Sequence, residues 1–140
     1  MKQKMTASEL STFIGEVFQE VADSFEVQEA GPGTVTVRMA IGKEHLRPGE
    51  TISGPTMFSL ADVSMYLAVL ALIGPVALAV TTNCSIDFMR KPVAGADLIG
   101  KARVLKLGRA LAVGDVMIFS EGHDAPVARA SLTYSIPPEI

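Results

Sequence analysis

The chain has 140 residues, of which 49% are hydrophobic and 19% charged, so it is long enough for a domain with its own core and too apolar for a disordered protein. Its net charge of −3 gives no basic field that would attract nucleic acid, and two histidines with one cysteine exclude a histidine- or thiolate-rich metal site. Cys84, the only cysteine, cannot form an internal disulfide, which is typical of a reducing, cytoplasmic compartment.

The first predicted element is an amphipathic helix. Residues 1–6 lack the apolar run of a secretory signal, and Thr6 and Glu9 have the spacing of a capping box that starts a helix. Apolar residues then recur every three or four positions, at Leu10, Phe13, Ile14, Val17, Phe18 and Val21. The polar face is acidic, whereas membrane-surface helices are usually rich in lysine and arginine, so we expect this helix to pack on its own domain.

A hairpin and a long loop follow this helix. Residues 25–30 and 34–41 are predicted to be strands, joined by a turn at Gly31-Pro32-Gly33. The second strand alternates polar residues with an apolar face made of Val35, Val37, Met39 and Ile41. Residues 42–55 are rich in glycine and proline, which predicts a loop, and long loops in compact domains often carry function.

A long apolar helix is predicted from Pro55 to about Ile73, because proline favours the first turn and Gly74-Pro75 stops a helix. Its apolar residues go all the way round, which is typical of a central, buried helix. Residues 63–80 also form an uncharged run of about the length that spans a membrane. The Gly74-Pro75 break and the lack of flanking positive charge favour a buried helix, a turn and a buried strand instead.

Four strands are predicted after this helix, over residues 76–89, 97–107, 111–120 and 127–136. Turns recur about every dozen residues, which predicts an antiparallel meander. One sheet wrapped around one central helix fits this order of elements, so the sequence predicts an α+β fold in a single domain, residues 1–140. Open sheet edges and a high apolar content favour a dimer or a larger assembly.

Asp62 is the only ionisable residue between Glu50 and Asp87 apart from the tyrosine and cysteine side chains. A carboxylate in an apolar helix loses hydration, so a partner group, a second subunit or a function must offset the cost. Two interpretations are open from the residues alone. Asp62 is either a buried acid that bonds to backbone or hydroxyl groups and stabilises an assembly, or a functional carboxylate.

The order of elements, with Ser53-Gly54-Pro55 before a helix that carries Leu60-Ala61-Asp62, resembles the hotdog fold. More narrowly, it resembles the phenylacetic-acid-degradation (PaaI-like) branch of the acyl-CoA thioesterases. The residues that carry this resemblance further are Asp87 to Pro92 with Gly95, Leu105 to Arg109, and the closing strand from Ala130 to Ile136. The resemblance implies a homodimer or homotetramer with active sites at the interface. It also implies hydrolysis of a small or medium acyl-CoA to the acid and free coenzyme A, without a metal or redox cofactor.

The resemblance also implies roles for individual residues. Asp62 would be the general base or the nucleophile, and the N–H of Gly54 or of Thr56 would polarise the thioester carbonyl, because Pro55 has no N–H. The positive end of the helix dipole lies at the same place. The family places a hydroxyl opposite the acid across the dimer interface, and Thr81 matches it best. Asn83 is expected next on the same face, and either side chain would orient the water.

This sequence departs from the family pattern at three positions. Ser53 replaces a histidine, Pro55 replaces a glycine, and Arg47 stands where the family often has an asparagine. Ser53 fits a helix N-cap better than a nucleophile, since no histidine base is nearby in sequence. These departures support an alternative function, a non-catalytic acyl-CoA or acyl-carrier binding protein. A hydratase of the same fold would need an aspartate–histidine pair, which the sequence does not supply.

Cations near turns are candidates for binding the phosphates of coenzyme A, and they are Arg90, Lys91, Lys106 and Arg109. Each is equally explained as a solvated turn charge. Arg47 is a loop cation or a phosphate contact rather than a catalyst. Tyr66 lies four residues after Asp62, on the same helix face, so it is either a core residue with a bonded hydroxyl or a contact for the acyl group.

Overall fold

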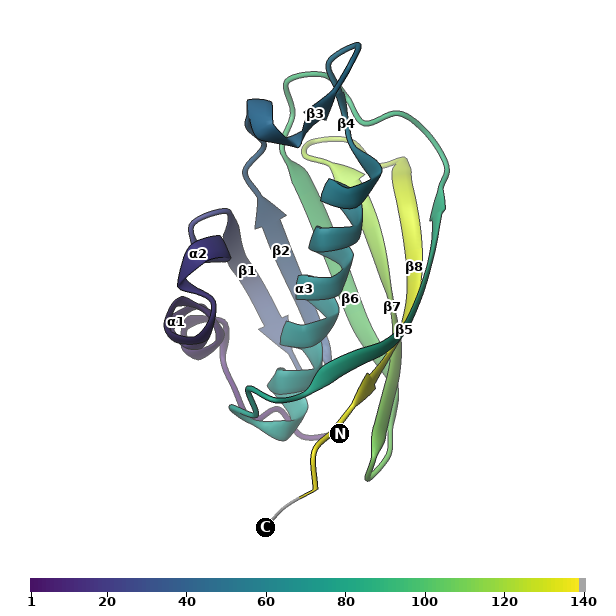
Figure 1. The fold of residues 1–140 in the computed structure, drawn as a ribbon. Helices are drawn as coiled ribbons and strands as arrows, with labels where there is room; N and C mark the ends of the chain where they lie inside the picture. The colour runs from purple at the N-terminus through teal and green to yellow at the C-terminus, as the bar shows by residue number, and fades with distance from the viewer. Residues whose placement is uncertain (139–140) are drawn as a thin grey trace.

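The computed structural model describes residues 1–138, apart from the side chains of Glu20 and Val21. A six-stranded antiparallel sheet wraps around one long helix, α3 (Gly54–Ile73), and two shorter helices, α1 (Ala7–Val17) and α2 (Gln19–Ala22), lie beside the edge strand β1 (Figure 1). In spatial order the strands are β1 (Phe25–Gly31), β2 (Thr34–Met39), β6 (Leu98–Leu107), β7 (Leu111–Ser120), β8 (Pro126–Ser135) and β5 (Val80–Phe88). This confirms the predicted α+β arrangement of a sheet around a central helix.

Helix α3 occupies the concave face of the sheet. It begins at the N-cap Ser53 and ends at Gly74, whose φ of +91° suits glycine and whose successor is Pro75. Most of its side chains are buried, and those of Leu60, Leu67 and Leu70 are fully so. Among the described residues α3 is the one helix long and apolar enough to span a membrane, and 72% of its most apolar stretch is buried inside the protein, as expected of a core helix.

The predicted first helix is interrupted at Phe18. The capping box of Thr6 and Glu9 is present, but α1 ends at Val17, and Phe18 has φ −133° and ψ 55° before the four-residue α2. The break coincides with an edge-to-face contact between the rings of Phe18 and Tyr66. Val21 was also predicted to lie on the apolar face, but its side chain is not among those that the structure describes.

The predicted meander is correct for β6, β7 and β8 and wrong for β5, which pairs with β8. After β5 the chain crosses the ends of the neighbouring strands. At the start of this crossing, Met89 N–H donates to the Val127 carbonyl at 2.8 Å. At the far side of the crossing, Glu121 N–H donates to the Asp97 carbonyl at 2.8 Å. The crossing therefore places β5 at the outer edge of the sheet, beside the last strand.

Strand β5 also starts later and is less buried than predicted. Residues 76–79 form a turn, in which Val76 N–H donates to Gly74 O and Ala79 N–H to Val76 O, so the strand begins at Val80. Most of its residues are exposed in the single chain because β8 is its only neighbour in the sheet. The prediction of a buried strand was therefore wrong for the isolated chain.

The loop predicted over residues 42–55 contains short elements that the sequence pattern did not predict. A 3₁₀ turn, η1 (Lys43–His45), leads into a two-stranded hairpin of β3 (Leu46–Arg47) and β4 (Thr51–Ile52). At the tip of the hairpin Gly49 and Glu50 both have positive φ. The hairpin stands above the start of α3 (Figure 1).

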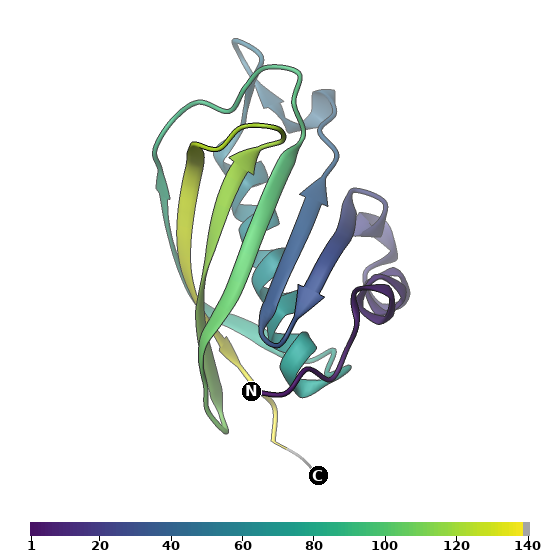
Figure 2. The same cartoon turned by 180° about the vertical axis from the view of Figure 1, so that it is seen from behind.

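Two glycines in the sheet allow close contact with α3. A Cβ atom at Gly100 would lie 2.6 Å from Ser64 Oγ, and one at Gly114 would overlap the Arg103 carbonyl and lie 2.6 Å from Met65 Cε. The outer face of the sheet, seen in Figure 2, is not covered by a helix of the described chain and carries polar residues, including the Arg103–Asp115 ion pair.

We predict that Gly114→Ala lowers the free energy of unfolding by about 3 kcal/mol, because the added methyl group overlaps backbone as well as Met65. Gly15→Ala is the matched control: Gly15 lies inside α1, and a methyl group added there would meet no atom within 4 Å, so alanine should stabilise the protein by about 1 kcal/mol. Urea denaturation of both variants checks the prediction, and equal effects would contradict it.

Candidate active site

Asp62 lies on the one stripe of α3 that the sheet leaves uncovered. Pro55 and Phe58 on this stripe are exposed, and Ser59, Asp62 and Val63 are half-buried. The carboxylate is therefore the only charge on this helix face. It is accessible in the single chain rather than sealed in the core.

Two hydroxyl groups converge on one oxygen of Asp62. Thr81 Oγ1 donates to Asp62 Oδ1 at 2.5 Å, and Tyr134 OH donates to the same oxygen at 2.7 Å. The Tyr134 hydroxyl also lies 2.9 Å from the backbone carbonyl of Asp62. Oδ2 has no hydrogen-bond partner among the described residues. The carboxylate is thus held through Oδ1, and Oδ2 is the oxygen available to a reactant.

Tyr134 is a site residue that the sequence did not reveal. Burial, and then its hydrogen bond to the Asp62 carboxylate, raise the pKa of the Tyr134 phenol, so it remains a protonated donor. Tyr134 lies in the closing strand that carries part of the family resemblance, but nothing in the sequence distinguishes it from the other inward residues of this alternating strand. Its role becomes visible only from the pairing of Tyr134 with Thr81 in the sheet.

The structure corrects two expectations about β5. Thr81 reaches Asp62 within the same chain, not across an interface. A bulge at Thr82 shifts the register, so that Thr81 is opposite Tyr134 but Asn83 is opposite Thr133. Since Tyr134 is buried against α3 and Thr133 is on the other face, Asn83 points away from Asp62. The expectation that Asn83 shares a face with Thr81 was therefore wrong, whereas a role of Asn83 in catalysis stays a prediction.

Cys84 lies on the same face of β5 as Thr81, opposite Leu132. Burial and the negative charge of Asp62 raise the pKa of the Cys84 thiol, so the reactive thiolate is disfavoured. Among the described side chains, no group of three or more His, Cys, Asp or Glu residues is arranged to hold a metal ion.

A cavity of about 350 Å³ opens beside Asp62, between α1, α3 and the start of β5. Its walls are mainly apolar and include Phe18, Val63 and Val80, as well as the rings of Tyr66 and Tyr134. The Tyr66 hydroxyl donates to the Ala77 carbonyl at 3.1 Å, as expected of a core tyrosine with a bonded hydroxyl. The ring of Tyr66 still forms part of the cavity wall.

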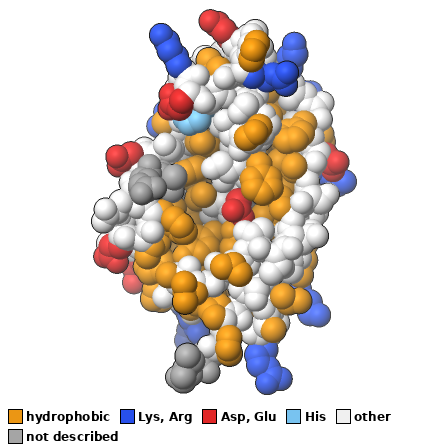
Figure 3. Space-filling model, in the orientation of Figure 1, with side chains coloured by type: hydrophobic (Ala, Val, Ile, Leu, Met, Phe, Trp, Pro, Cys, Tyr) orange, Lys and Arg blue, Asp and Glu red, His pale blue; other side chains and the backbone are white. Residues whose placement is uncertain are grey.

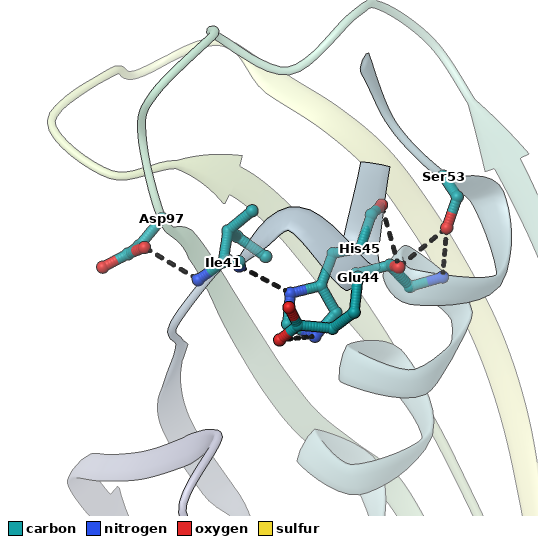
Figure 4. Close-up of polar contacts among 7 residues, drawn as sticks. Ile41, Glu44, His45, Ser53 and Asp97 are labelled. Carbon is teal, nitrogen blue, oxygen red and sulfur yellow. Dashed lines mark hydrogen bonds and ion pairs between the residues drawn. The ribbon is translucent and has the colours of Figure 1, made fainter. Parts of the chain in front are cut away.

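The start of α3 presents one free backbone donor. Ser53 is the N-cap, as predicted, and its Oγ accepts the N–H of Thr56 at 3.3 Å (Figure 4). Thr56 N–H is therefore occupied, and Pro55 has no N–H to offer. No described residue accepts the N–H of Gly54. Of the candidates predicted for polarising a carbonyl, Gly54 is the one that remains available.

The loop before α3 is held by hydrogen bonds to its backbone N–H and carbonyl groups. Asp97 Oδ1 accepts the N–H of Ile41 at 2.9 Å, and His45 Nδ1 accepts the N–H of Gly42 at 2.8 Å (Figure 4). The His45 carbonyl in turn accepts the N–H of Ser53 at 2.9 Å. His45 thus positions the helix start through its backbone, and its ring is occupied by the loop.

Three of the predicted cations share a second cavity, of about 730 Å³, at the start of α3. Arg47, Arg90 and Lys91 line it together with Gly54 and the exposed ring of Phe88. The Arg90 Nε atom donates to the Pro126 carbonyl at 2.8 Å, which holds this side chain beside the strand end. Phe88 lies directly against Gly54 and was not predicted to be a site residue.

Lys106 and Arg109 do not join these cations in the single chain. They flank the β6–β7 turn, which leads into β7 at Leu111. Phe88 pairs with Ala128 of β8, and Ala128 pairs with Ile118 of β7, so Phe88 is level with Ile118. Seven residues of strand separate the two levels, or about 20 Å. Figure 1 shows the β6–β7 turn and the segment after β5 at opposite ends of the molecule.

Gly54 and Asp62 are also separated. They are eight residues apart on one straight helix, which corresponds to about 12 Å along its axis. They line different cavities. A single thioester cannot contact both groups of the same chain.

Comparison with known proteins identifies the family. A model of the thioesterase superfamily matches residues 49–127, more than half of the chain. The chain belongs to the thioesterase superfamily. No curated protein sequence matches this thioesterase-superfamily chain.

Solved structures of this superfamily share its fold. A candidate thioesterase from Silicibacter sp. TM1040 is 55% identical, with a TM-score of 0.92 over 99% of this chain and 96% of that one. A variant of PaaI, the phenylacetic acid degradation protein of Thermus thermophilus, is 28% identical, with a TM-score of 0.72 over 90% and 99% of the two chains. A hypothetical thioesterase of Streptococcus pneumoniae TIGR4 with coenzyme A is 21% identical, with a TM-score of 0.77 over 90% and 98%. The hotdog fold and the PaaI-like resemblance are therefore confirmed.

The contact between Tyr134 and Asp62 makes a prediction about stability at alkaline pH. The raised pKa keeps the folded phenol neutral, whereas in the unfolded chain it ionises near its ordinary value of about 10. The folded state then binds more protons, so the free energy of unfolding should fall by about 1.4 kcal/mol per pH unit above that value. Tyr134→Phe should remove this part of the slope.

Urea denaturation from about pH 9 to about pH 11 measures the slope. Thr81→Ala is the matched control, because it removes the other donor to Asp62 Oδ1 without removing a titrating group. It should keep the wild-type slope. A Tyr134→Phe protein with the wild-type slope would show that Tyr134 does not retain its proton.

Proposed function

We propose that this protein hydrolyses a small or medium acyl-CoA thioester to the free acid and coenzyme A. The observation that carries the proposal is the state of Asp62, whose Oδ1 is held by Thr81 and Tyr134 while Oδ2 has no partner among the described residues beside an apolar cavity. A fixed carboxylate with one free oxygen is suited to activating water or attacking a carbonyl carbon. Membership of the thioesterase superfamily supports this chemistry.

In the proposed reaction, oxygen attacks the thioester carbonyl and the carbon–sulfur bond breaks. Asp62 Oδ2 either takes a proton from the attacking water or attacks the carbonyl itself, giving an anhydride that water then hydrolyses. The N–H of Gly54, at the positive end of α3, stabilises the negative charge that develops on the carbonyl oxygen. The sulfur leaves as the thiolate of coenzyme A and takes up a proton, so the products are one acid and one thiol.

We propose that two copies of the chain complete each active site. Gly54 and Asp62 of one chain are about 12 Å apart, so the thioester would contact Asp62 of one copy and Gly54 of the other. The surface around α3 supports self-association, because Phe58, Val80, Phe88 and Met89 are exposed there and β5 has an open edge. Figure 3 shows hydrophobic side chains gathered over the middle of this face.

The cavity at the start of α3 is the proposed site for the nucleotide end of coenzyme A. Arg47, Arg90 and Lys91 supply positive charge there beside Gly54. The hypothetical thioesterase of S. pneumoniae, which has the same fold, was crystallised with coenzyme A. Lys106 and Arg109, at the opposite end of the sheet, would contribute only through a partner copy.

The second candidate function is binding of an acyl-CoA or acyl-carrier thioester without hydrolysis. It is favoured by Arg47 and Ser53, which replace the asparagine and histidine that the family resemblance leads us to expect. The hydroxyl of Ser53 is already engaged by Thr56 as a helix cap. A ligand that binds and survives intact would distinguish this function from hydrolysis.

We predict that the wild-type protein releases thiol from a panel of acyl-CoA esters, and that Asp62→Asn reduces kcat by about 10²–10⁴-fold because the base or nucleophile is lost. Asp115→Asn is the matched control: it makes the same exchange on the outer face of the sheet and should keep wild-type activity. If no ester releases thiol while acyl-CoA still binds to the wild-type protein, the binding function replaces the enzymatic one.

We also predict that Phe58→Arg separates the copies and abolishes hydrolysis, because a charge at the centre of an apolar contact loses its hydration. Loss of an interface anchor typically raises the dissociation constant about 30-fold or more. Light scattering measures the mass and thiol release the activity, with Leu105→Arg on an exposed site of β6 as control. A monomer with full activity would contradict the two-copy site.

A further inference from the structure

The cavity beside Asp62 is lined by the carboxylate and by three aromatic rings. Tyr66 lies one helical turn after Asp62 along α3, about 6 Å away. The rings of Tyr134, Tyr66 and Phe18 follow one another along the wall. The centroids of Tyr134 and Tyr66 are 6.1 Å apart, and those of Tyr66 and Phe18 are 5.6 Å apart. The series starts at Asp62, to which Tyr134 is bonded, and ends at Phe18.

The polar groups of this wall are already occupied. The Tyr66 hydroxyl is bonded to Ala77 O, and the hydroxyls of Thr81 and Tyr134 are bonded to Asp62. Beyond the carboxylate, a ligand would therefore meet only apolar surface, such as Val63, Ala79 and Val80. A hydroxylated or charged tail would lose its hydration there without finding a partner.

Phe18 differs from the rest of the N-terminal helix. Ile14, one turn earlier, is 2% exposed and belongs to the core, whereas Phe18 is 44% exposed. Phe18 lies at the break between α1 and α2, and its ring meets Tyr66 edge-on, with an angle of 80° between the two planes. It lines the cavity without being part of the buried core, so its size can change while the core remains intact.

We propose that this cavity is the acyl subsite and that Phe18 sets the length of the acyl group that it accepts. The ligand is an unsubstituted, compact apolar acyl group, with its thioester carbonyl at Asp62 and its far end at the Phe18 ring. Phe18 is a specificity-determining residue, and it does not touch the reacting atoms. The inference rests on the proposed function, because it assigns the thioester end of the ligand to Asp62.

The test uses binding of S-alkyl-CoA thioethers, which cannot be hydrolysed, with straight alkyl chains graded from ethyl to dodecyl. In the wild-type protein, affinity should rise roughly fourfold per methylene group and then level off where the chain reaches Phe18. In Phe18→Ala the rise should continue to longer chains, and in Phe18→Trp it should stop at shorter ones. Val17→Ala, at an exposed neighbouring position of α1, should keep the wild-type limit.

Opposite shifts in the alanine and tryptophan variants support the proposal, because a merely unstable protein would lose affinity for every chain length. The same limit in all four proteins overturns the role of Phe18. Hydrolysis of acyl-CoA by the wild-type protein, measured alongside, separates the two failures. Turnover with an unchanged length limit overturns this inference alone, whereas the absence of both thioether binding and turnover overturns the proposed function with it.

Discussion

The structure depends on the burial of one helix that is apolar on almost every side. Helix α3 carries a single charge in 20 residues, so most of its surface must be covered for the chain to remain folded in water. The sheet achieves this by curving around the helix, and Gly100 and Gly114 allow the strands to approach it closely. One stripe remains uncovered, and Asp62 lies on it. This carboxylate therefore lies where a single chain leaves part of the helix exposed.

The position of β5 connects the fold to the site. Because the chain crosses over after β5, this strand pairs with β8, which brings Thr81 opposite Tyr134. The two hydroxyls then meet at one oxygen of Asp62. Hydrogen bonding offsets part of the cost of holding a carboxylate beside an apolar cavity, and it also distinguishes the two oxygens. With β5 at another place in the sheet, Asp62 would lose the hydrogen bond from Thr81.

Local patterns in the sequence were sufficient for α3, for β6 to β8 and for Asp62, because caps, the Gly74-Pro75 stop and alternating residues are signals within a few positions. Long-range relations were not available from such patterns. The pairing of β5 with β8, the bulge at Thr82 that turns Asn83 away, and the contact of Tyr134 with Asp62 each join segments far apart in the chain. The break at Phe18 accompanies its contact with Tyr66, 48 positions later, which no helix periodicity contains.

The departures from the family pattern concentrate the proposed chemistry on few groups. Ser53 uses its hydroxyl to cap α3 and thereby occupies the N–H of Thr56, while Pro55 removes another donor. The helix start is left with the N–H of Gly54, and the middle of the helix with Oδ2 of Asp62. Neither group can be moved toward the other, because a continuous helix fixes their separation at about 12 Å. In the proposed enzyme, assembly of two copies is therefore part of the catalytic mechanism as well as a means of covering the apolar face.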